Sequence, residues 1–191
     1  RTWKDLNLNV NKIANFFKKI NLKKNDRVAA YLPNLIETVE AFLATTSMGA
    51  IWSSCSPDFG TEGVIERFAQ IKPKILIIAD QYYYNGKKIN IIERIPTILK
   101  KIKSIKNVIV VNYPGKNYLK FKKNNKIKIN FWHEIIKNKP KKMEFKKFDF
   151  EHNLAILYSS GTTGKPKCIC HRAGGVLLQH LKEHQLHCDI K

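Results

Sequence analysis

Apolar positions along this chain recur with two spacings, which alternate from one segment to the next. Residues 3–17 carry apolar side chains three and four positions apart, which predicts an amphipathic helix with Thr2 as its N-cap. Short apolar runs bounded by turn residues predict strands, which lie at residues 27–32, 51–54, 75–79, 108–111 and 154–158. Their nearly continuous apolar character predicts that these strands are buried.

Between the strands the pattern returns to helical spacing. Further helices are predicted from Asn34 to Gly49, from Thr61 to Ile71, from Asn90 to Ile102 with a break or kink at Pro96, and over residues 131–137. Asn34 and Glu37 have the spacing of a capping box. Residues 112–130 are lysine-rich and without period, which predicts an irregular surface segment. The alternation as a whole predicts an α/β fold with a mostly parallel sheet flanked by helices.

The composition is that of a globular domain. The chain has 191 residues, of which 43% are hydrophobic, and this is enough for one sizeable core. Trp3, Trp52 and Trp132 each lie among apolar residues, and we predict that they anchor this core. No run of about 18 apolar residues occurs, and the first residues are polar, so we predict neither a transmembrane helix nor a signal peptide. Four cysteines without a C-x-x-C pair favour reduced thiols in a cytoplasmic protein.

The charge is strongly positive. The formal net charge is +20, from 35 Lys and Arg residues against 15 Asp and Glu residues. Such a charge is compatible with a nucleic-acid partner. The excess is nearly all lysine, however, spread over predicted helices and loops, with no groove-reading motif beside it. We therefore expect no nucleic-acid and no membrane partner, and we keep a basic, non-catalytic binding module as an alternative. The residue pattern sets no oligomeric state.

Cysteine and histidine residues gather between positions 168 and 188. Cys168 and Cys170 alternate onto one side of a potential strand, and His180 and His184 share a helix face. Their spacing, with His187-Cys188 following, matches neither a zinc finger nor His-Glu-x-x-His. We predict ordinary packing and surface positions for these side chains and no metal site.

The most informative segment runs from Tyr158 to Lys167 and reads Tyr-Ser-Ser-Gly-Thr-Thr-Gly-Lys-Pro-Lys. A predicted strand leads directly into two glycines, four hydroxyls and two lysines. Glycines permit tight turns and close approach of a ligand, successive N–H groups of such a turn can hold an anion, and hydroxyls and a lysine bind phosphate oxygens. The sequence therefore predicts a phosphate-binding loop.

This loop is not a Walker A motif. That motif requires glycine five residues before the Gly-Lys pair and Ser or Thr directly after it. Here position 159 is Ser and position 166 is Pro, which disfavours a kinase or GTPase.

The segment resembles the ATP-phosphate loop of the adenylate-forming superfamily, which contains acyl-CoA synthetases, luciferases and the adenylation domains of peptide synthetases. The resemblance implies that this loop binds the phosphates of ATP, through Ser159, Ser160, Gly161, Thr162, Thr163, Gly164 and Lys167. Many members have glycine after Pro-Lys, where this chain has Cys168.

A second string narrows the resemblance to one branch. Residues 52–60 read Trp-Ser-Ser-Cys-Ser-Pro-Asp-Phe-Gly and are similar to the acetoacetate-activating branch of the acyl-CoA synthetases. Residues 26–34, His171, Gly174-Gly175 and Leu186 to Asp189 also resemble this branch. Another short-chain acid–CoA ligase, for acetate or propionate, remains an alternative within the same class.

The resemblance implies a reaction in two steps, in which ATP and Mg²⁺ activate a carboxylate as its adenylate and coenzyme A then displaces AMP. It also implies that two segments lie near CoA, namely Phe59-Gly60 and the turn at Gly86-Lys87. From the residues alone, Asn85-Gly86 is equally well a simple tight turn and Lys87 a solvated charge.

Several strings of the superfamily are absent from these residues. We find no Tyr-Gly-x-Thr-Glu string for adenine and Mg²⁺ and no Thr-Gly-Asp string for ribose. We therefore expect residues 1–191 to be an N-terminal part of the large AMP-binding domain, which the resemblance describes as two packed α/β sheets. The small C-terminal domain with the catalytic lysine is expected to be absent, so no catalytic residue is assigned within this chain.

Overall fold

A seven-stranded sheet forms the centre of the molecule, with the strand order β7-β6-β3-β1-β2-β8-β9. The computed structural model describes residues 2–113, 127–140, 145–159 and 164–190. The strands of the sheet are β1 (Arg27–Tyr31), β2 (Ile51–Cys55), β3 (Ile75–Ala79), β6 (Asn107–Val111), β7 (Lys128–Phe131), β8 (Asn153–Ser159) and β9 (Lys167–Arg172). Each neighbouring pair is parallel except β8 and β9, which are antiparallel. The predicted α/β fold with a mostly parallel sheet is confirmed.

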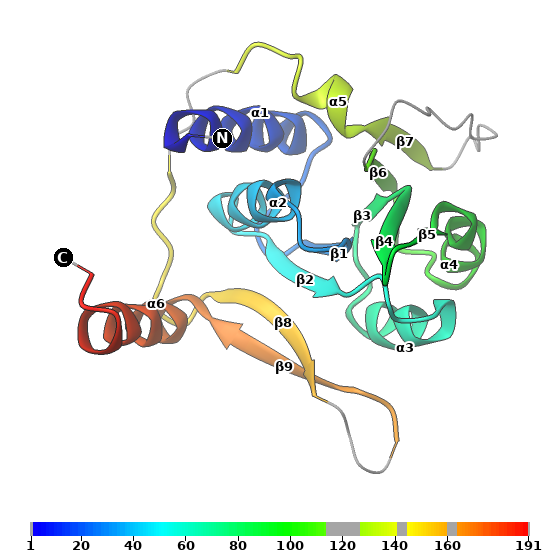
Figure 1. Ribbon diagram of the computed structural model, residues 1–191. Coiled ribbons are helices and arrows are strands. Elements are labelled where there is room, and N and C mark those ends of the chain that lie inside the picture. The colour runs from blue at the N-terminus through cyan, green and yellow to red at the C-terminus, as the bar shows by residue number, and fades with distance from the viewer. Residues whose placement is uncertain (1, 114–126, 141–144, 160–163, 191) are drawn as a thin grey trace.

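Helices cover both faces of the sheet (Figure 1). α1 (Trp3–Lys19), α2 (Ile36–Ser47) and the short α5 (Trp132–Ile135) lie together on one face. α3 (Thr61–Ile71) and α4 (Ile95–Lys101) pack against each other on the opposite face. α6 (Ala173–Lys182) continues into one π-helical turn (Glu183–His187) and follows the β8–β9 ribbon away from the rest of the sheet. Within the described ranges, no helix combines the length and apolar character needed to cross a membrane.

The core lies between the central strands and these helices. β1, β3 and β6 are buried along almost their whole length, as expected for parallel strands that are covered on both faces. α1 contributes a buried stripe that includes Ile13 and Phe17, and a capping box between Thr2 and Asp5 begins this helix as predicted for its N-cap. Asn9 of α1 donates a hydrogen bond to the buried Glu40 of α2 at 2.9 Å.

Two of the three tryptophans anchor the core. Trp52 and Trp132 are buried, which confirms their prediction. The prediction for Trp3 is wrong, because its side chain is 86% exposed. It stands at the first position of α1, before the buried stripe begins at Asn9, and its ring lines a surface groove together with Phe145.

Several predicted elements differ in detail from the structure. α2 begins at Ile36 with Leu35 as its N-cap and no side-chain cap, so the capping box predicted at Asn34 and Glu37 does not form. The helix predicted over residues 90–102 is a 3₁₀ turn (Ile92–Arg94) followed by α4, which begins next to Pro96 because proline is tolerated in the first turn.

Two strand pairings were not predicted. β7 lies in the segment expected to be irregular, and its pairing with β6 overrides the weak local pattern. Residues 114–126 of that segment lie outside the described residues. β4 (Gln81–Tyr84) and β5 (Lys87–Asn90) form a separate antiparallel hairpin after β3.

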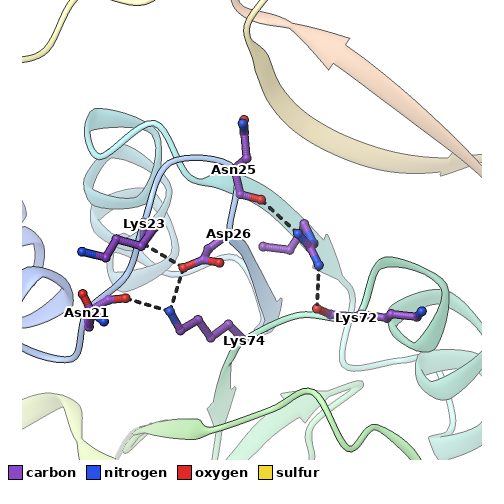
Figure 2. A network of polar contacts seen from close by, with 7 residues as sticks. Asn21, Lys23, Asn25, Asp26, Lys72 and Lys74 are labelled. Atoms are coloured by element: carbon purple, nitrogen blue, oxygen red, sulfur yellow. Dashed lines mark hydrogen bonds and ion pairs between the residues drawn. The ribbon is translucent and has the colours of Figure 1, made fainter.

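A polar network ties together the amino ends of β1 and β3 (Figure 2). Lys74 lies 2.9 Å from the Asp26 carboxylate and donates to the Asn21 carbonyl oxygen at 2.7 Å. Arg27 donates to three main-chain carbonyl oxygens, which belong to Asn25, Ile71 and Lys72. Asp26 also accepts from the backbone N–H of Lys23. These contacts fix the edge of the sheet that is opposite to the loops described next.

The carboxyl ends of β1, β2 and β3 open at the other edge. After β1 the chain passes to α2 on one face, whereas after β2 and β3 it passes to α3 and α4 on the other face. Open α/β sheets bind ligands outside the carboxyl ends of their strands, where successive connections pass to opposite faces of the sheet.

Candidate functional site

The predicted phosphate loop connects β8 to β9. Ser159 is the last residue of β8 and stands opposite Lys167, the first residue of β9. Gly164 and Lys165 are exposed, and Gly164 has φ +145°, a conformation that L side chains rarely adopt. Four of the residues assigned to ATP, namely Ser160, Gly161, Thr162 and Thr163, lie outside the described residues. The described ends of the loop are therefore at the surface and not within the core.

The exit of the loop is held by α3. Gln70 donates its side-chain N–H to the carbonyl oxygen of Pro166 at 2.9 Å, and Pro166 itself is buried. The Cys168 thiol lies 3.6 Å from the Gln70 side-chain oxygen. Cys168, which stands where many members of the superfamily have glycine, is thus next to the hydrogen bond between Gln70 and Pro166.

β8, which leads into the loop, is less buried than predicted. Ala155 is its one buried residue, and Leu157 is 44% exposed, because β8 pairs with β2 over a short stretch and then diverges from it. Ser53 of β2 joins the two strands by donating to the Ile156 carbonyl oxygen at 2.8 Å, and the Tyr158 hydroxyl lies 3.0 Å from the same Ser53 oxygen. Burial raises the pKa of Tyr158 far above its ordinary value, so this hydroxyl stays protonated.

The second predicted segment is the loop between β2 and α3. The Tyr31 hydroxyl, at the end of β1, lies 2.5 Å from the Phe59 carbonyl oxygen and 3.1 Å from that of Pro57. Arg94 donates to the same two carbonyl oxygens, at 2.9 and 3.1 Å, and to the Tyr31 hydroxyl. α3 begins at Thr61 with Gly60 as its N-cap and without a side-chain cap, so its first N–H groups are left for other partners.

The third predicted segment is the β4–β5 hairpin. Asn85 and Gly86 both have positive φ, of 48° and 72°, and this is the two-residue turn that their sequence indicates. Lys87 is exposed at the start of β5. The structure thus confirms the tight turn, whereas a contact between Lys87 and CoA stays a prediction.

The hairpin and the β2–α3 loop are in direct contact. Tyr82 of β4 is buried, and its hydroxyl lies near the Asp58 carboxylate of the loop. Burial and, after it, this neighbouring carboxylate raise the pKa of the Tyr82 hydroxyl. The structure therefore brings together the two segments that sequence reasoning assigned separately to CoA.

Arg67 of α3 lies between this loop and β8. Its guanidinium carbon is 4.0 Å from the centre of the Phe59 ring and 6.0 Å from that of Tyr158. The nearby Cys55 thiol is buried, and burial raises its pKa to about 12, although Arg67 opposes the shift. Cys55 is thus a protonated core residue and not a nucleophile.

Sequence reasoning missed the residues that connect these segments, which are Tyr31, Arg67, Gln70 and Arg94. The scarcity of arginine offered a signal. The chain has only five arginines, and arginine differs from lysine in presenting a planar fork of donors. Arg27, Arg67 and Arg94 all donate to main-chain carbonyl oxygens.

The described residues offer no protein cage for a metal ion. In the part of the chain that the structure describes, no three side chains of the types His, Cys, Asp and Glu converge. The ring centres of His180 and His184 are 6.1 Å apart, and the Cys170 thiol contacts the Asn153 side-chain oxygen at 3.1 Å. All four cysteines are free thiols.

Two large hollows lie away from the predicted loops. One, of about 600 Å³, is bordered by α2, β8, β9 and α6, and its lining includes Phe42, Trp52 and His171. The other, of about 520 Å³, lies between α1, α2 and residues 145–154. Neither is lined by Ser159 or by Gly164 to Lys167.

Comparison with known proteins identifies the family. The model of the AMP-binding enzyme family matches residues 1–189. The chain is 42% identical to acetoacetyl-coenzyme A synthetase of Rhizobium meliloti over 190 residues, which cover 100% of this chain and 29% of the relative. Identity to acetoacetyl-CoA synthetase of Gallus gallus is 43% over 192 residues, covering 99% and 29%.

A solved structure agrees with these relatives. Acetoacetyl-CoA synthetase from Streptomyces lividans superposes with a TM-score of 0.90 at 34% identity, and the match covers 99% of this chain and 28% of that one. The chain thus spans somewhat less than a third of the length of these relatives. The resemblance drawn from the phosphate loop and from residues 52–60 is confirmed, and the chain belongs to the AMP-binding enzyme family.

Proposed function

We propose that this chain is part of the large AMP-binding domain of an enzyme that ligates acetoacetate to coenzyme A with consumption of ATP. The observation that carries the proposal is the β8–β9 loop, in which Ser159 and Lys167 face each other across two paired strands in a chain about 42% identical to acetoacetyl-CoA synthetases along its length. Its products would be acetoacetyl-CoA, AMP and pyrophosphate.

The first step needs negative charge to be held as pyrophosphate leaves. A carboxylate oxygen of the acid attacks the α-phosphorus of ATP, and the bond from that phosphorus to the β-phosphate oxygen breaks with its electron pair on pyrophosphate. The residues that we assign to this charge are Ser159, Ser160, Gly161, Thr162, Thr163, Gly164 and Lys167. A cradle of N–H groups, hydroxyls and a lysine stabilises such charge without rearranging during the reaction.

The second step forms the thioester. The sulfur of CoA attacks the acyl carbonyl carbon, the bond from that carbon to the AMP oxygen breaks, and the thiol proton is released. We assign CoA contacts to Phe59, Gly60, Gly86 and Lys87. The hydrogen bonds from Arg94, which follows the hairpin, to the carbonyl oxygens of Pro57 and Phe59 support this assignment, because they hold the two segments side by side. The uncapped start of α3 at Gly60 supplies further N–H groups suited to an anion.

Mg²⁺ is assigned to the nucleotide and not to the described side chains. No cluster of metal-ligating residues occurs among them, and ATP phosphates themselves bind this ion. We further propose a cytoplasmic location, which the four free thiols support.

The substrate is tested in the whole protein. Acetoacetate, acetate and propionate are each supplied with ATP, Mg²⁺ and CoA, and the acyl-CoA products are identified by mass spectrometry. We expect acetoacetyl-CoA to form with the highest kcat/KM. A higher kcat/KM for acetate or propionate would show that the enzyme is another short-chain acid–CoA ligase and not an acetoacetate ligase. Absence of any acyl-CoA, together with salt-sensitive binding of RNA or DNA, would favour the basic binding module instead.

The loop is tested by comparing two neighbouring lysines. Lys167→Ala should weaken acid-dependent ATP–pyrophosphate exchange by about ten-fold or more, because a charge-assisted contact contributes roughly 1.5–3 kcal/mol. Lys165→Ala removes a charge two residues away and should leave the exchange within about two-fold. Equal losses in the two variants would contradict a specific role for Lys167.

A further inference from the structure

Arg94 connects two segments that are far apart in the sequence. It ends the 3₁₀ turn that follows the β4–β5 hairpin, and its side chain reaches the loop between β2 and α3. Figure 1 shows the hairpin beside the end of β3, close to α3 and α4. The contacts of Arg94 therefore decide how the loop sits relative to the hairpin.

The guanidinium holds the loop by its backbone. One terminal nitrogen of Arg94 donates to the carbonyl oxygens of Pro57 and Phe59 and contacts the Tyr31 hydroxyl. Tyr31 is fully buried and approaches the same two carbonyl oxygens. With both carbonyl groups turned inward, the Phe59 side chain remains 38% exposed and is stacked on Arg67.

Arg94 can act as a fixed point because its own backbone is anchored. Ile91 and Ile92 both donate to the carbonyl oxygen of Asp80 at 3.1 Å, which closes the base of the hairpin. The buried Asp80 carboxylate in turn accepts from the backbone N–H of Tyr113 at 2.9 Å. The Arg94 backbone N–H donates to the Ile91 carbonyl oxygen at 3.0 Å. These hydrogen bonds hold the backbone of Arg94 at the base of the hairpin.

A second contact joins the same two segments from the hairpin side. Asp58 stands between the two residues whose carbonyl groups Arg94 holds, and its carboxylate lies near the hydroxyl of the buried Tyr82. Asp58 is kept in place by Ser56, whose hydroxyl donates to its carboxylate at 2.8 Å. The hydrogen bonds of Arg94 and the neighbouring Tyr82 and Asp58 side chains therefore both place the loop beside the hairpin.

We propose that Arg94 is a positioning residue, which holds the Pro57–Gly60 loop against the β4–β5 hairpin in the arrangement that receives CoA. This inference rests on the proposed function for its ligand. A lysine cannot replace Arg94 fully, because an ammonium is a point donor whereas the guanidinium presents several donors in a fixed plane.

The test is a kinetic comparison of two arginines in the whole protein. Arg94→Ala should raise the KM for CoA by about ten-fold, because a loop that is no longer held in its binding geometry must be ordered when CoA binds. Acid-dependent ATP–pyrophosphate exchange, which does not involve CoA, should stay within about two-fold. Arg27→Ala is the matched control, because Arg27 also donates to three carbonyl oxygens but lies at the opposite edge of the sheet. It should leave the KM for CoA unchanged. The proposal would be overturned if both variants raised the KM for CoA equally. It would also be overturned if Arg94→Ala lowered the ATP–pyrophosphate exchange by as large a factor as it raised the KM for CoA.

Two further variants keep the test decisive if Arg94→Ala fails to fold. Arg94→Lys should restore part of the CoA affinity. Tyr31→Phe keeps the buried ring, removes only the hydroxyl, and should raise the KM for CoA by about three-fold. An unchanged KM in Tyr31→Phe and a wild-type KM in Arg94→Lys would together refute positioning through these carbonyl groups.

Hydrogen exchange separates failure of this inference from failure of the proposed function. In the whole protein without ligands, Arg94→Ala should accelerate exchange of the amides in residues 56–60, whereas Arg27→Ala should not. If the wild-type protein shows no CoA-dependent activity but the exchange rates differ in this way, the CoA assignment fails and the positioning stands. If the exchange rates of residues 56–60 are the same in both variants, positioning by Arg94 is wrong.

Discussion

At the scale of single residues, the contacts around the candidate site are made by side chains whose polar atoms act on the backbone. Tyr31 and Arg94 bind carbonyl groups of the β2–α3 loop, and Gln70 binds the carbonyl group of Pro166. Such contacts fix a loop without occupying its outer surface, so the outward atoms stay free for a ligand. The titratable groups beneath them are kept neutral by burial, and Cys55 is the clearest case.

We predict that Cys55 resists alkylation in the folded chain. Its pKa of about 12 keeps the thiol protonated at pH 8, and the side chain is buried. Mass spectrometry after iodoacetamide treatment should find label on the exposed Cys168, Cys170 and Cys188 before Cys55, and on all four after denaturation. Labelling of Cys55 at the same rate as Cys188 in the folded chain would contradict its burial.

The same raised pKa predicts a loss of stability in alkali. The ordinary thiol pKa is 9.0, so the unfolded chain releases the Cys55 proton at lower pH than the folded chain does. Folded molecules then bind more protons, and the free energy of unfolding falls as the pH rises from about 9 towards 12. Urea unfolding at pH 7, 9 and 10 measures the slope. Cys55→Ala should show a shallower decline, and an identical decline in both proteins would exclude Cys55 as a source.

At the scale of elements, the turn after α2 decides how the helix joins β2. Gly49 follows the helix with φ +69°, and a Cβ atom built on it would overlap the Phe148 ring. Phe148 stacks on His152, just before β8, so Gly49 lets the segment that leads into β8 pack on the end of α2. Glycine is therefore favoured at position 49 for two reasons, namely the positive φ and the close contact with the Phe148 ring.

We expect Gly49→Ala to destabilise the chain by about 1–3 kcal/mol, because it combines a strained φ with overpacking. Gly86→Ala is the matched control, since Gly86 has nearly the same φ, +72°, with open space around it. The control therefore shows the cost of φ alone, and urea unfolding compares the two variants. Equal losses of stability would mean that the Phe148 ring adapts.

At the scale of the whole molecule, the two edges of the parallel sheet differ in their contacts. The amino ends of β1 and β3 are joined by the Asp26–Lys74 ion pair and by Arg27, while the carboxyl ends carry the β2–α3 loop and the hairpin. The positive charge follows neither edge, because lysines are distributed over helices and loops alike.

We predict that a polypeptide of residues 1–191 alone forms no acyl-CoA. Its sequence contains the phosphate loop but neither the adenine nor the ribose string of the superfamily, so the acyl-adenylate cannot be held in place. The purified polypeptide, supplied with acetoacetate, ATP, Mg²⁺ and CoA, is assayed by mass spectrometry for acetoacetyl-CoA. Its formation above the level of the Lys167→Ala variant would disprove the prediction.

Elements whose residues all favour one structure are predictable from the sequence. α3 and β3 lie where the periodicity placed them, since their apolar spacing is strong, and the Asn85-Gly86 turn follows from residues that readily adopt positive φ. The phosphate loop and residues 52–60 were enough to identify the family, because their patterns are local.

Features that depend on contacts between distant residues follow from the packing of the whole fold and not from local sequence. β7 forms because β6 offers an open edge, and Trp3 is exposed because the core stripe of α1 starts after it. Arg94 lies 35 residues from Phe59, and no local pattern indicates that they meet. The spacing of apolar residues depends on the local structure of the chain, so it predicts helices and strands. The partner of a forked side chain such as that of Arg94 is fixed only when sheet order and helix packing bring two loops together.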